Sequence, residues 1–512
     1  MMISAERISD LVNPGAGNSG DVPALVEPSG SWTYSQLADV KAEARTWIAS
    51  LGVRPGDRVM IVFENCRAFV AILLALAELD AWPVLVNARL SAREADEIRV
   101  HSGARRVLYT TAASHHAREH AKRCGASTHD AGALGHIAVS VVDEKVVPEP
   151  VDSDVSQRVA AMIYTSGTTG KPKGVMLTHR NLLFVASVSA QIRSLARQDR
   201  LYGVLPMSHA VGLSVVLLGA LISGASLYLT PRFDPVATLN LLEKESLTVA
   251  LGAPGMFSVL VDYAKLKGIK RLELPGLRII SSSGAPLQPN LKAQVEELFG
   301  MPLYNGYGVT ECSPNISQAV VGEHRTDTSV GRVLPGVEVR FVGPDQNQVP
   351  EGEIGELWVR GPNVMKGYYR APEETAAVIN PEGWFNTRDL AYLKDGYLFI
   401  VGRTKDLIIR FGENVYPAEV EAALNSHPAV LRSAVIGRSV DGAQGGEEVV
   451  AFVQPRPGST ISEAQLSQHA AQHLAPYKRP SKILLVPDMP LTPTGKVIKG
   501  ELTKLTEFAS AR

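Results

Sequence analysis

The chain has 512 residues and a mass of 55.0 kDa. A chain of this length is too long to fold around one hydrophobic core, and we predict about three domains or subdomains. Hydrophobic residues make up 45% and charged residues 20%, which excludes a disordered chain. The formal net charge of −1 argues against a surface built for nucleic acid or anionic lipid. We therefore expect no nucleic-acid partner.

Three cysteines stand far apart, at Cys66, Cys124 and Cys312. An odd number of isolated cysteines fits free thiols in a reducing compartment. The N-terminal segment carries Glu6 and Asp10 and lacks the apolar core of a signal peptide. We therefore expect a cytoplasmic location.

Apolar runs alternate with helical segments over the first 330 residues. Residues 66–79 and 92–101 have helical patterns, and residues 111–157 form a polar, variable stretch. Strands alternating with helices predict an α/β fold with largely parallel, doubly wound sheets. The predicted strands are 57–63, 83–86, 107–110, 159–164, 201–205, 247–251 and 277–281.

The uncharged stretch 210–231 has the length of a membrane span. Three serines (Ser214, Ser223 and Ser226) and Gly224 interrupt it. A buried helix over about 211–222, followed by a strand over 226–230, continues the surrounding rhythm better. We therefore predict no integral membrane span.

The pattern changes near residue 330. Short strands at 337–342, 355–360 and 396–401, separated by Gly, Pro and Asp turns, predict a small antiparallel barrel or meander. Beyond residue 402 the pattern is α+β, with helices near 417–426 and 463–473 and strands near 431–437 and 448–453. We thus predict a large N-terminal domain, residues 1–402, whose barrel-like part covers about 330–402, and a smaller C-terminal domain, residues 403–512.

Two sequence patterns resemble binding motifs but are better explained as ordinary structural features. Residues 15–20 match G-x-G-x-x-G, but no strand precedes them and Pro23 follows where a helix should begin. His116, His120 and Cys124 share one helix face, yet their neighbours are those of a solvated surface helix and no fourth ligand is nearby. We expect a loop at the first and no metal at the second.

The strongest motif is Tyr164-Thr-Ser-Gly-Thr-Thr-Gly-Lys-Pro-Lys-Gly-Val175, which directly follows an apolar strand. Glycines let backbone N–H groups approach a polyphosphate, hydroxyls add donors, and lysines neutralise charge. It is not a Walker loop, because Thr165 stands at the first glycine position and Pro172 at the hydroxyl position. It predicts a phosphate loop of another kind.

This string resembles the signature of the AMP-forming, adenylate-forming enzymes, which include acyl-CoA synthetases, peptide-synthetase adenylation domains and luciferases. Further blocks follow in that family's order and cover nearly the whole chain. They are 282–287, 305–311 (Asn-Gly-Tyr-Gly-Val-Thr-Glu), 384–389, 396–406, 412–421 and 493–496.

The resemblance implies an ATP site. The phosphate loop (Thr165, Ser166, Gly167, Thr168 and Thr169) with Lys173 would hold the β- and γ-phosphates. Thr310 would contact the α-phosphate, and Glu311 with Thr165 would hold Mg²⁺. The adenine and ribose side of the site would consist of Gly284, Ala285, Tyr307 (stacked on adenine), Gly308, Asp389 (ribose hydroxyls) and Arg403.

The same resemblance implies a mobile C-terminal domain that serves two reactions in one pocket. Lys405 resembles the hinge position, and Gly412 would line the pantetheine route of coenzyme A. Lys496 would stabilise charge between carboxylate and α-phosphate during adenylation. His209 matches a residue that gates the acid pocket in acyl- and aryl-CoA ligases.

Three positions depart from the family pattern. Arg388 stands where Gly usually precedes the ribose aspartate, Phe411 replaces a common Gly, and Val497 follows Lys496 where Arg is frequent. The first two bear on ribose positioning and on the pantetheine route, which serves thioester formation rather than adenylation.

We therefore predict an ATP- and Mg²⁺-dependent carboxylic acid–CoA ligase that releases AMP and pyrophosphate, acting as a monomer or homodimer. Small and apolar residues around His209 indicate a fatty or aromatic acid, whereas a small dicarboxylate would need a cation such as Arg232. The alternatives are an enzyme that loads a carrier protein and a nucleotide sensor without catalysis. Intact Lys173, Glu311, Asp389 and Lys496 argue against the sensor.

Overall fold

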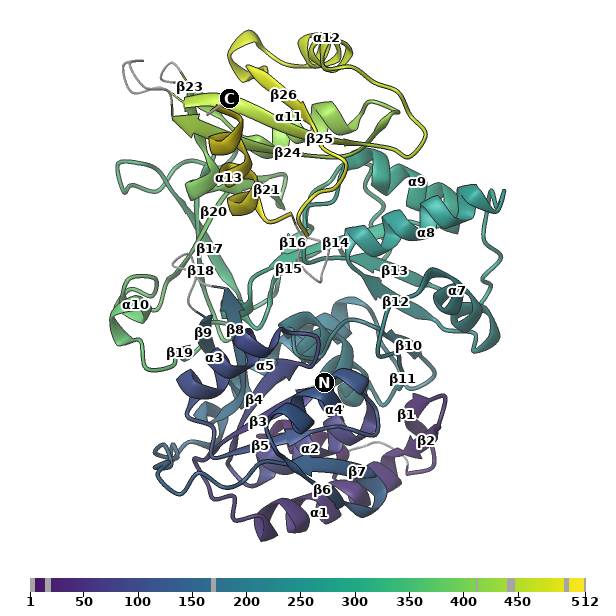
Figure 1. The fold of residues 1–512 in the computed structure, drawn as a ribbon, viewed down its shortest axis with the longest axis vertical. Coiled ribbons are helices and arrows are strands. Elements are labelled where there is room, and N and C mark those ends of the chain that lie inside the picture. The colour runs from purple at the N-terminus through teal and green to yellow at the C-terminus, as the bar shows by residue number, and fades with distance from the viewer. Residues whose placement is uncertain are drawn as a thin grey trace.

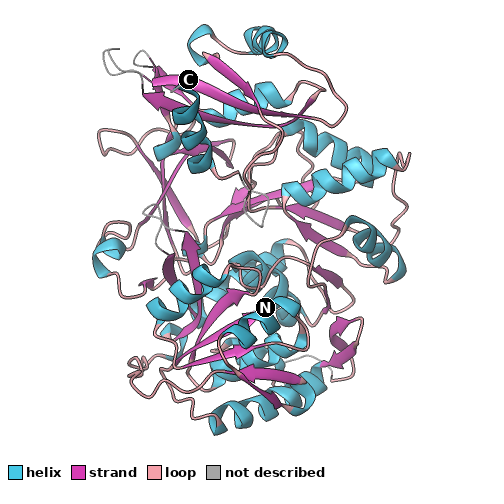
Figure 2. Ribbon diagram, viewed as in Figure 1, coloured by secondary structure: helices cyan, strands magenta, loops and turns pink. Residues whose placement is uncertain are grey.

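The computed structural model describes residues 5–13, 20–166, 172–410, 413–439, 447–491 and 497–510. They form a large N-terminal domain of several sheets and a smaller C-terminal domain, coloured from green to yellow at the top of Figure 1. Helices and strands are mixed along the whole chain (Figure 2). The predicted α/β fold class is confirmed.

An eight-stranded sheet carries the phosphate-loop motif. Its four central strands are parallel, and the strands added at both edges are antiparallel. In sheet order the strands are β19 (Gly367–Tyr368), β9 (Pro172–Thr178), β8 (Val159–Ser166), β4 (Trp82–Asn87), β3 (Arg58–Phe63), β5 (Arg106–Tyr109), β7 (His136–Val139) and β6 (Ser127–Asp130). The polar stretch 111–157 thus contributes two strands that we did not predict.

A nine-stranded sheet lies beside it and is parallel from β14 to β1. In sheet order its strands are β16 (Arg332–Val333), β15 (Asn315–Gln318), β14 (Leu303–Gly308), β13 (Ile279–Ser282), β12 (Val249–Gly252), β10 (Arg200–Gly203), β11 (Ser226–Leu229), β1 (Pro23–Glu27) and β2 (Gly30–Thr33). In both sheets the predicted motifs follow the carboxyl ends of parallel strands, where ligands bind in open α/β sheets.

Helices cover the two sheets. Helix α2 is apolar on all sides and is buried from Phe69 to Ala77, as expected for a helix enclosed by the core. Thr33 and Ser91 begin α1 and α3 by accepting hydrogen bonds from backbone N–H groups of the first turn. The α-helices of this domain are α1 (Tyr34–Ser50), α2 (Arg67–Glu78), α3 (Ala92–Ser102), α4 (His115–Arg123), α5 (His179–Ile192), α6 (Gly219–Ser223), α7 (Pro235–Lys244), α8 (Pro254–Leu266), α9 (Pro289–Phe299) and α10 (Pro372–Ala376).

The stretch predicted as one helix over 211–222 consists of two kinds of helix. Residues Val211–Leu218 form a π-helix, η4, which continues into α6. Gly212 permits this start, because a Cβ there would lie 2.2 Å from the Pro206 carbonyl oxygen. Among the described residues, no helix has both the length and the apolar character of a membrane span.

The remaining sheets are small. The predicted barrel or meander is a four-stranded antiparallel meander of β17 (Glu338–Val342), β18 (Gly355–Arg360), β20 (Phe385–Lys394) and β21 (Tyr397–Arg403). The C-terminal domain contains β22 (Ile408–Arg410), β23 (Glu413–Val415), β24 (Val430–Ser439), β25 (Glu447–Pro455), β26 (Lys482–Leu485), α11 (Pro417–Asn425), α12 (Glu463–His473) and α13 (Lys499–Ser510). It meets the large domain where Arg456 pairs with Asp262 of α8 at 3.1 Å.

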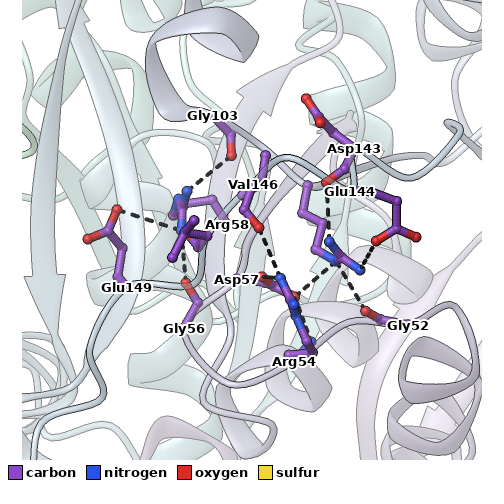
Figure 3. Close-up of polar contacts among 12 residues, drawn as sticks. Gly52, Arg54, Gly56, Asp57, Arg58, Gly103, Asp143, Glu144, Val146 and Glu149 are labelled. Atoms are coloured by element: carbon purple, nitrogen blue, oxygen red, sulfur yellow. Dashed lines mark hydrogen bonds and ion pairs between the residues drawn. The ribbon is translucent and has the colours of Figure 1, made fainter.

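Buried arginines fix the irregular segment that precedes β8 (Figure 3). Asp57 is fully buried between Arg54, at 3.1 Å, and Arg105, at 3.3 Å. Arg58, also buried, donates to the carbonyls of Gly56 and Val147 and lies 3.6 Å from Glu149. Arg105 also pairs with the exposed Glu144 at 3.0 Å. We refer to these six residues (Arg54, Asp57, Arg58, Arg105, Glu144 and Glu149) as the arginine network.

Candidate active site

The phosphate-loop motif connects two antiparallel strands. Thr165, at the end of β8, pairs across the ladder with Lys173 of β9. Gly174 fits beneath Met162 and Tyr164, because a Cβ there would lie 2.8 Å from the Met162 sulfur. The hydroxyl of Tyr164, just before the loop, forms a hydrogen bond of 2.8 Å with Nδ1 of His101.

Lys173 is held between two side chains of the segment that follows β18. Its ammonium forms an ion pair with Glu374 of α10. The same ammonium lies 5.1 Å from the ring centroid of Tyr368, within cation–π range. The Lys173 side chain is 20% exposed and that of Glu374 is 48% exposed, so the pair is open to solvent.

Glu311 lies on a short 3-10 helix, Thr310–Cys312, directly after β14. The Tyr368 hydroxyl donates to Glu311 Oε1 at 2.9 Å, and the Glu311 carbonyl accepts from Met365 N–H at 2.8 Å. Gly308 allows the preceding turn, since a Cβ would lie 1.8 Å from the Pro314 carbonyl oxygen. Burial and the nearby Glu311 charge raise the pKa of Tyr368, so its phenol stays protonated.

Asp389 lies in β20, on the adenine and ribose side of the candidate site. It is 4% exposed, lies opposite Arg403 on the neighbouring strand, and accepts from Arg403 Nε at 3.1 Å. The Tyr307 hydroxyl donates to the other carboxylate oxygen. Burial and the charge of Asp389 raise the pKa of Tyr307 well above its usual range. Thus three predicted residues from separate blocks meet here.

Arg388, which departs from the family pattern, adopts a left-handed backbone with φ of +57°. Its N–H donates to Asn386 Oδ1 at 2.7 Å. A left-handed conformation favours glycine, because any Cβ crowds the following carbonyl. The structure thus explains why a glycine suits this position and shows that arginine occupies it under strain.

His209 follows β10 and directly precedes the π-helix. Surrounding protein lowers the pKa of His209 by desolvation, yet solvent still reaches the ring. The imidazole is therefore neutral at pH 7. The adjoining π-helix contains Leu213 and Val216, whose side chains are both fully buried. π-Helical turns often occur at functional sites.

Arg232 is already paired. It donates to Glu64 at 2.9 Å, and Glu64 is buried and also accepts from Ser114 at 2.7 Å. Hydrogen bonds from Arg232 and Ser114 outweigh the burial that opposes them, so the pKa of Glu64 falls. The cation that we considered for a dicarboxylate is thus neutralised by a carboxylate.

The other predicted positions divide into two groups. The adenine-side loop of Gly284 and Ala285 is solvent-accessible after β13, with Gly284 at φ of +87°, and Lys405 is exposed in the turn Thr404–Asp406. The remaining predictions lie outside the described residues or side chains, namely Ser166 (side chain), Gly167, Thr168, Thr169, Phe411, Gly412 and Lys496.

Sequence reasoning missed Tyr368 and Glu374. Both lie in Gly367-Tyr-Tyr-Arg-Ala-Pro-Glu-Glu-Thr375, where a tyrosine pair precedes a proline-initiated helix. The free cysteines are as predicted, but His120 is buried against Leu90 rather than solvated. Within the described ranges, no three His, Cys, Asp or Glu residues are placed to hold a metal.

Two family models match this chain. Residues 14–369 match the family "AMP-binding enzyme", and residues 419–496 match "AMP-binding enzyme C-terminal domain". The chain belongs to the AMP-binding enzyme family. This confirms the family resemblance found in the sequence.

Relatives within the family match over nearly their full length. A feruloyl-CoA synthase from Amycolatopsis sp is 36% identical over 477 residues, which cover 92% of this chain and 93% of that protein. An indoleacetate–CoA ligase from Aromatoleum aromaticum is 31% identical, covering 98% of both chains. ATP-bound MatB from Rhodopseudomonas palustris has a TM-score of 0.85 at 29% identity over 98% of each chain.

Proposed function

We propose that the chain is an ATP- and Mg²⁺-dependent carboxylic acid–CoA ligase that acts through an acyl-adenylate and releases AMP and pyrophosphate. The observation that carries this proposal is a pair of contact sets drawn from separate sequence blocks. Lys173 and Glu311 both contact Tyr368, and Tyr307 and Arg403 both bond to Asp389. Tyr307 and Glu311 belong to one block and are four residues apart, so the two sets together supply a cation, a metal-binding carboxylate and a ribose acceptor for one nucleotide. Relatives named as CoA ligases support the same reaction.

The chemistry requires two transfers. A carboxylate oxygen attacks the α-phosphorus of ATP, forming an O–P bond while the bond to pyrophosphate breaks. The thiol of CoA then attacks the acyl carbon, forming a C–S bond while AMP leaves with the original carboxylate oxygen. The first step concentrates negative charge, so it depends on cations and donors placed in advance.

We assign the residues as follows. Thr165 and Lys173, with loop residues 166–169, bind the β- and γ-phosphates, and Thr310 binds the α-phosphate. Asp389 accepts the ribose hydroxyls, positioned by Arg403, while the loop at Gly284, Ala285 and Gly308 and the Tyr307 ring receive adenine.

Mg²⁺ fits the donor set. Mg²⁺ is commonly held by one or two carboxylates together with substrate phosphates. The half-buried Glu311 carboxylate, with the Thr165 hydroxyl, would hold it and leave room for phosphate oxygens. When bound, the ion would neutralise charge that develops on the phosphates.

We propose an aromatic monocarboxylic acid as substrate. A neutral His209 beside the apolar π-helix favours an uncharged ring or chain. The Glu64–Arg232 pair weighs against a second carboxylate, because the cation is already satisfied. Relatives named for feruloyl-CoA, 4-coumarate and indoleacetate favour aromatic over fatty acids.

We further propose that residues 403–512 move as a lid relative to residues 1–402, with Lys405 as hinge, Gly412 on the pantetheine route and Lys496 acting in adenylation. Within the described parts of the chain, two ion pairs join these regions, Arg403–Asp389 and Arg456–Asp262, and so small a number suits a movable domain. The chain resembles ATP-bound MatB more closely, with a TM-score of 0.85, than apo MatB, at 0.76. The free cysteines support a cytoplasmic location.

One experiment tests the proposal. The protein is incubated with ATP, Mg²⁺ and a panel of aromatic, fatty and dicarboxylic acids, with and without CoA, and AMP, pyrophosphate and acyl-CoA are measured. We expect CoA-dependent AMP release with an aromatic acid. Adenylate without CoA turnover would indicate carrier-protein loading, and no adenylation with any acid would contradict the proposal.

A further inference from the structure

Two adjacent tyrosines lie at the end of β19, the edge strand that pairs with β9: Tyr368 is its last residue and Tyr369 follows it. Their side chains point to opposite sides of the strand. Tyr368 donates to Glu311 at 2.9 Å, whereas Tyr369 donates to Glu149 of the arginine network at 2.6 Å. Side chains alternate along a strand, so the pair divides between two surroundings. Both phenols are buried and both donate to a carboxylate, but only Tyr368 faces the nucleotide site.

We propose that Tyr368 is a positioning residue of the ATP site that links the metal-binding carboxylate to the phosphate-binding lysine. This inference rests on the proposed function. The Tyr368 hydroxyl fixes one oxygen of Glu311, and its ring supports the Lys173 ammonium. One side chain thereby sets the separation of the two groups that share the triphosphate.

The backbone around Tyr368 is itself fixed. Tyr368 pairs with Val175 of β9, two residues beyond Lys173, and its N–H donates to Thr375 Oγ1 at 2.9 Å. Thr375 lies on α10 next to Glu374, the residue paired with Lys173. Polyphosphate binding to Lys173 therefore exchanges the Glu374 carboxylate for phosphate, while Tyr368 keeps its position.

The hydroxyl and the ring have separable effects. Tyr368→Phe keeps the ring and removes the hydrogen bond to Glu311. Partners that orient a metal ligand typically change metal affinity about 10- to 100-fold, so we expect affinity for Mg·ATP to fall about 10-fold. Affinity for ATP in EDTA should stay within twofold of wild type. Tyr368→Leu also removes the ring, and we expect a further loss of about threefold in EDTA.

Tyr369→Phe is the matched control, because it also deletes one buried phenol hydroxyl bonded to a carboxylate. The measurement is calorimetric titration of each full-length variant with ATP in Mg²⁺ and in EDTA, without acid or CoA, together with melting temperatures. If Tyr368→Phe lowers folded yield, Thr375→Val shifts the same tyrosine without altering it, and we expect about a threefold loss for Mg·ATP.

The inference is supported if Tyr368→Phe loses affinity for ATP only in the presence of Mg²⁺ and Tyr369→Phe binds like wild type. Equal effects of the two variants, or none from Tyr368→Phe, would overturn it and leave the ligase proposal intact. Failure of the wild type to bind Mg·ATP would overturn both.

Discussion

The two sides of the Tyr368–Tyr369 pair are built differently. The arginine network (Figure 3) encloses the charges at its centre, where Asp57 is fully buried and Arg105 is 6% exposed, while its outer members Arg54 and Glu144 reach solvent. The nucleotide side is open, with Glu374 48% exposed and Arg403 42% exposed. Closed charge pairs hold a loop in place, whereas open ones can exchange a protein partner for a ligand.

The difference also concerns what each cluster contributes. Removing one member of a buried charge pair leaves an unpaired charge, which costs stability. Removing an exposed member costs little stability but deprives a ligand of its partner. Four substitutions test this contrast.

Asp57→Asn should destabilise the protein most. It removes the carboxylate that Arg54 and Arg105 share and leaves Arg105 buried with less compensation. We expect the free energy of unfolding to fall by about 4 kcal/mol, measured as a shift of the urea transition. Affinity for Mg·ATP at a temperature where the variant is folded should be unchanged. A selective loss of nucleotide binding would contradict a purely structural role.

Glu311→Gln should show the reverse pattern. The amide cannot hold Mg²⁺ as a carboxylate does, so we expect adenylation to slow about 100-fold, or about 2.7 kcal/mol in barrier. The urea midpoint should match that of wild type. Pyrophosphate release measures the rate, and a variant that is unstable but catalytically normal would refute the assignment.

His179, at the start of α5, provides a pH test of a buried group outside the nucleotide site. It is 1% exposed, accepts from the Ile8 N–H through Nδ1, and burial lowers its pKa to about 3. The unfolded chain binds a proton near pH 6.5 while the folded chain does not, so stability is present above pH 6.5 and falls as the pH drops towards 3. We expect about 2 kcal/mol of loss between pH 7 and 5.

His179→Asn is the control for this titration, since Oδ1 of asparagine can replace Nδ1 as the acceptor. Urea unfolding at both pH values should show a loss about 2 kcal/mol smaller for the variant than for wild type. An identical pH dependence in both proteins would show that His179 contributes nothing to it.

Arg388→Gly should produce the smallest of the four effects, and it should be stabilising. Glycine removes the crowding at φ of +57°, and we expect a gain of about 1 kcal/mol, seen as a higher melting temperature. Because the side chain is exposed, little packing is lost. A lower melting temperature would mean that contacts of the arginine outweigh its backbone strain.

Local patterns predicted the strands well, because apolar runs between turns report burial directly. The strand predicted at 57–63 corresponds to β3 at 58–63, and the helix predicted at 66–79 to α2 at 67–78. The π-helix was not predictable, because an apolar stretch without regularly spaced polar residues is equally consistent with an α-helix and a π-helix. Its start depends on the approach of Gly212 to Pro206, a contact visible only in three dimensions.

The candidate site was predictable where family motifs carry it and not where distant segments complete it. Tyr307, Asp389 and Arg403 were expected near one nucleotide, and they are in contact. The Tyr368–Glu311 and Glu64–Arg232 pairs join residues far apart in sequence. Their spacing in the sequence does not predict these contacts, because the packing of distant segments in three dimensions determines which side chains touch.

Activation of the acid as an acyl-adenylate can be followed by the transfer of labelled oxygen. An aromatic acid labelled with ¹⁸O in its carboxylate is turned over with ATP, Mg²⁺ and CoA, and the products are analysed by mass spectrometry. We predict one ¹⁸O atom in the phosphate of AMP and none in pyrophosphate. Label in orthophosphate with formation of ADP would contradict the account.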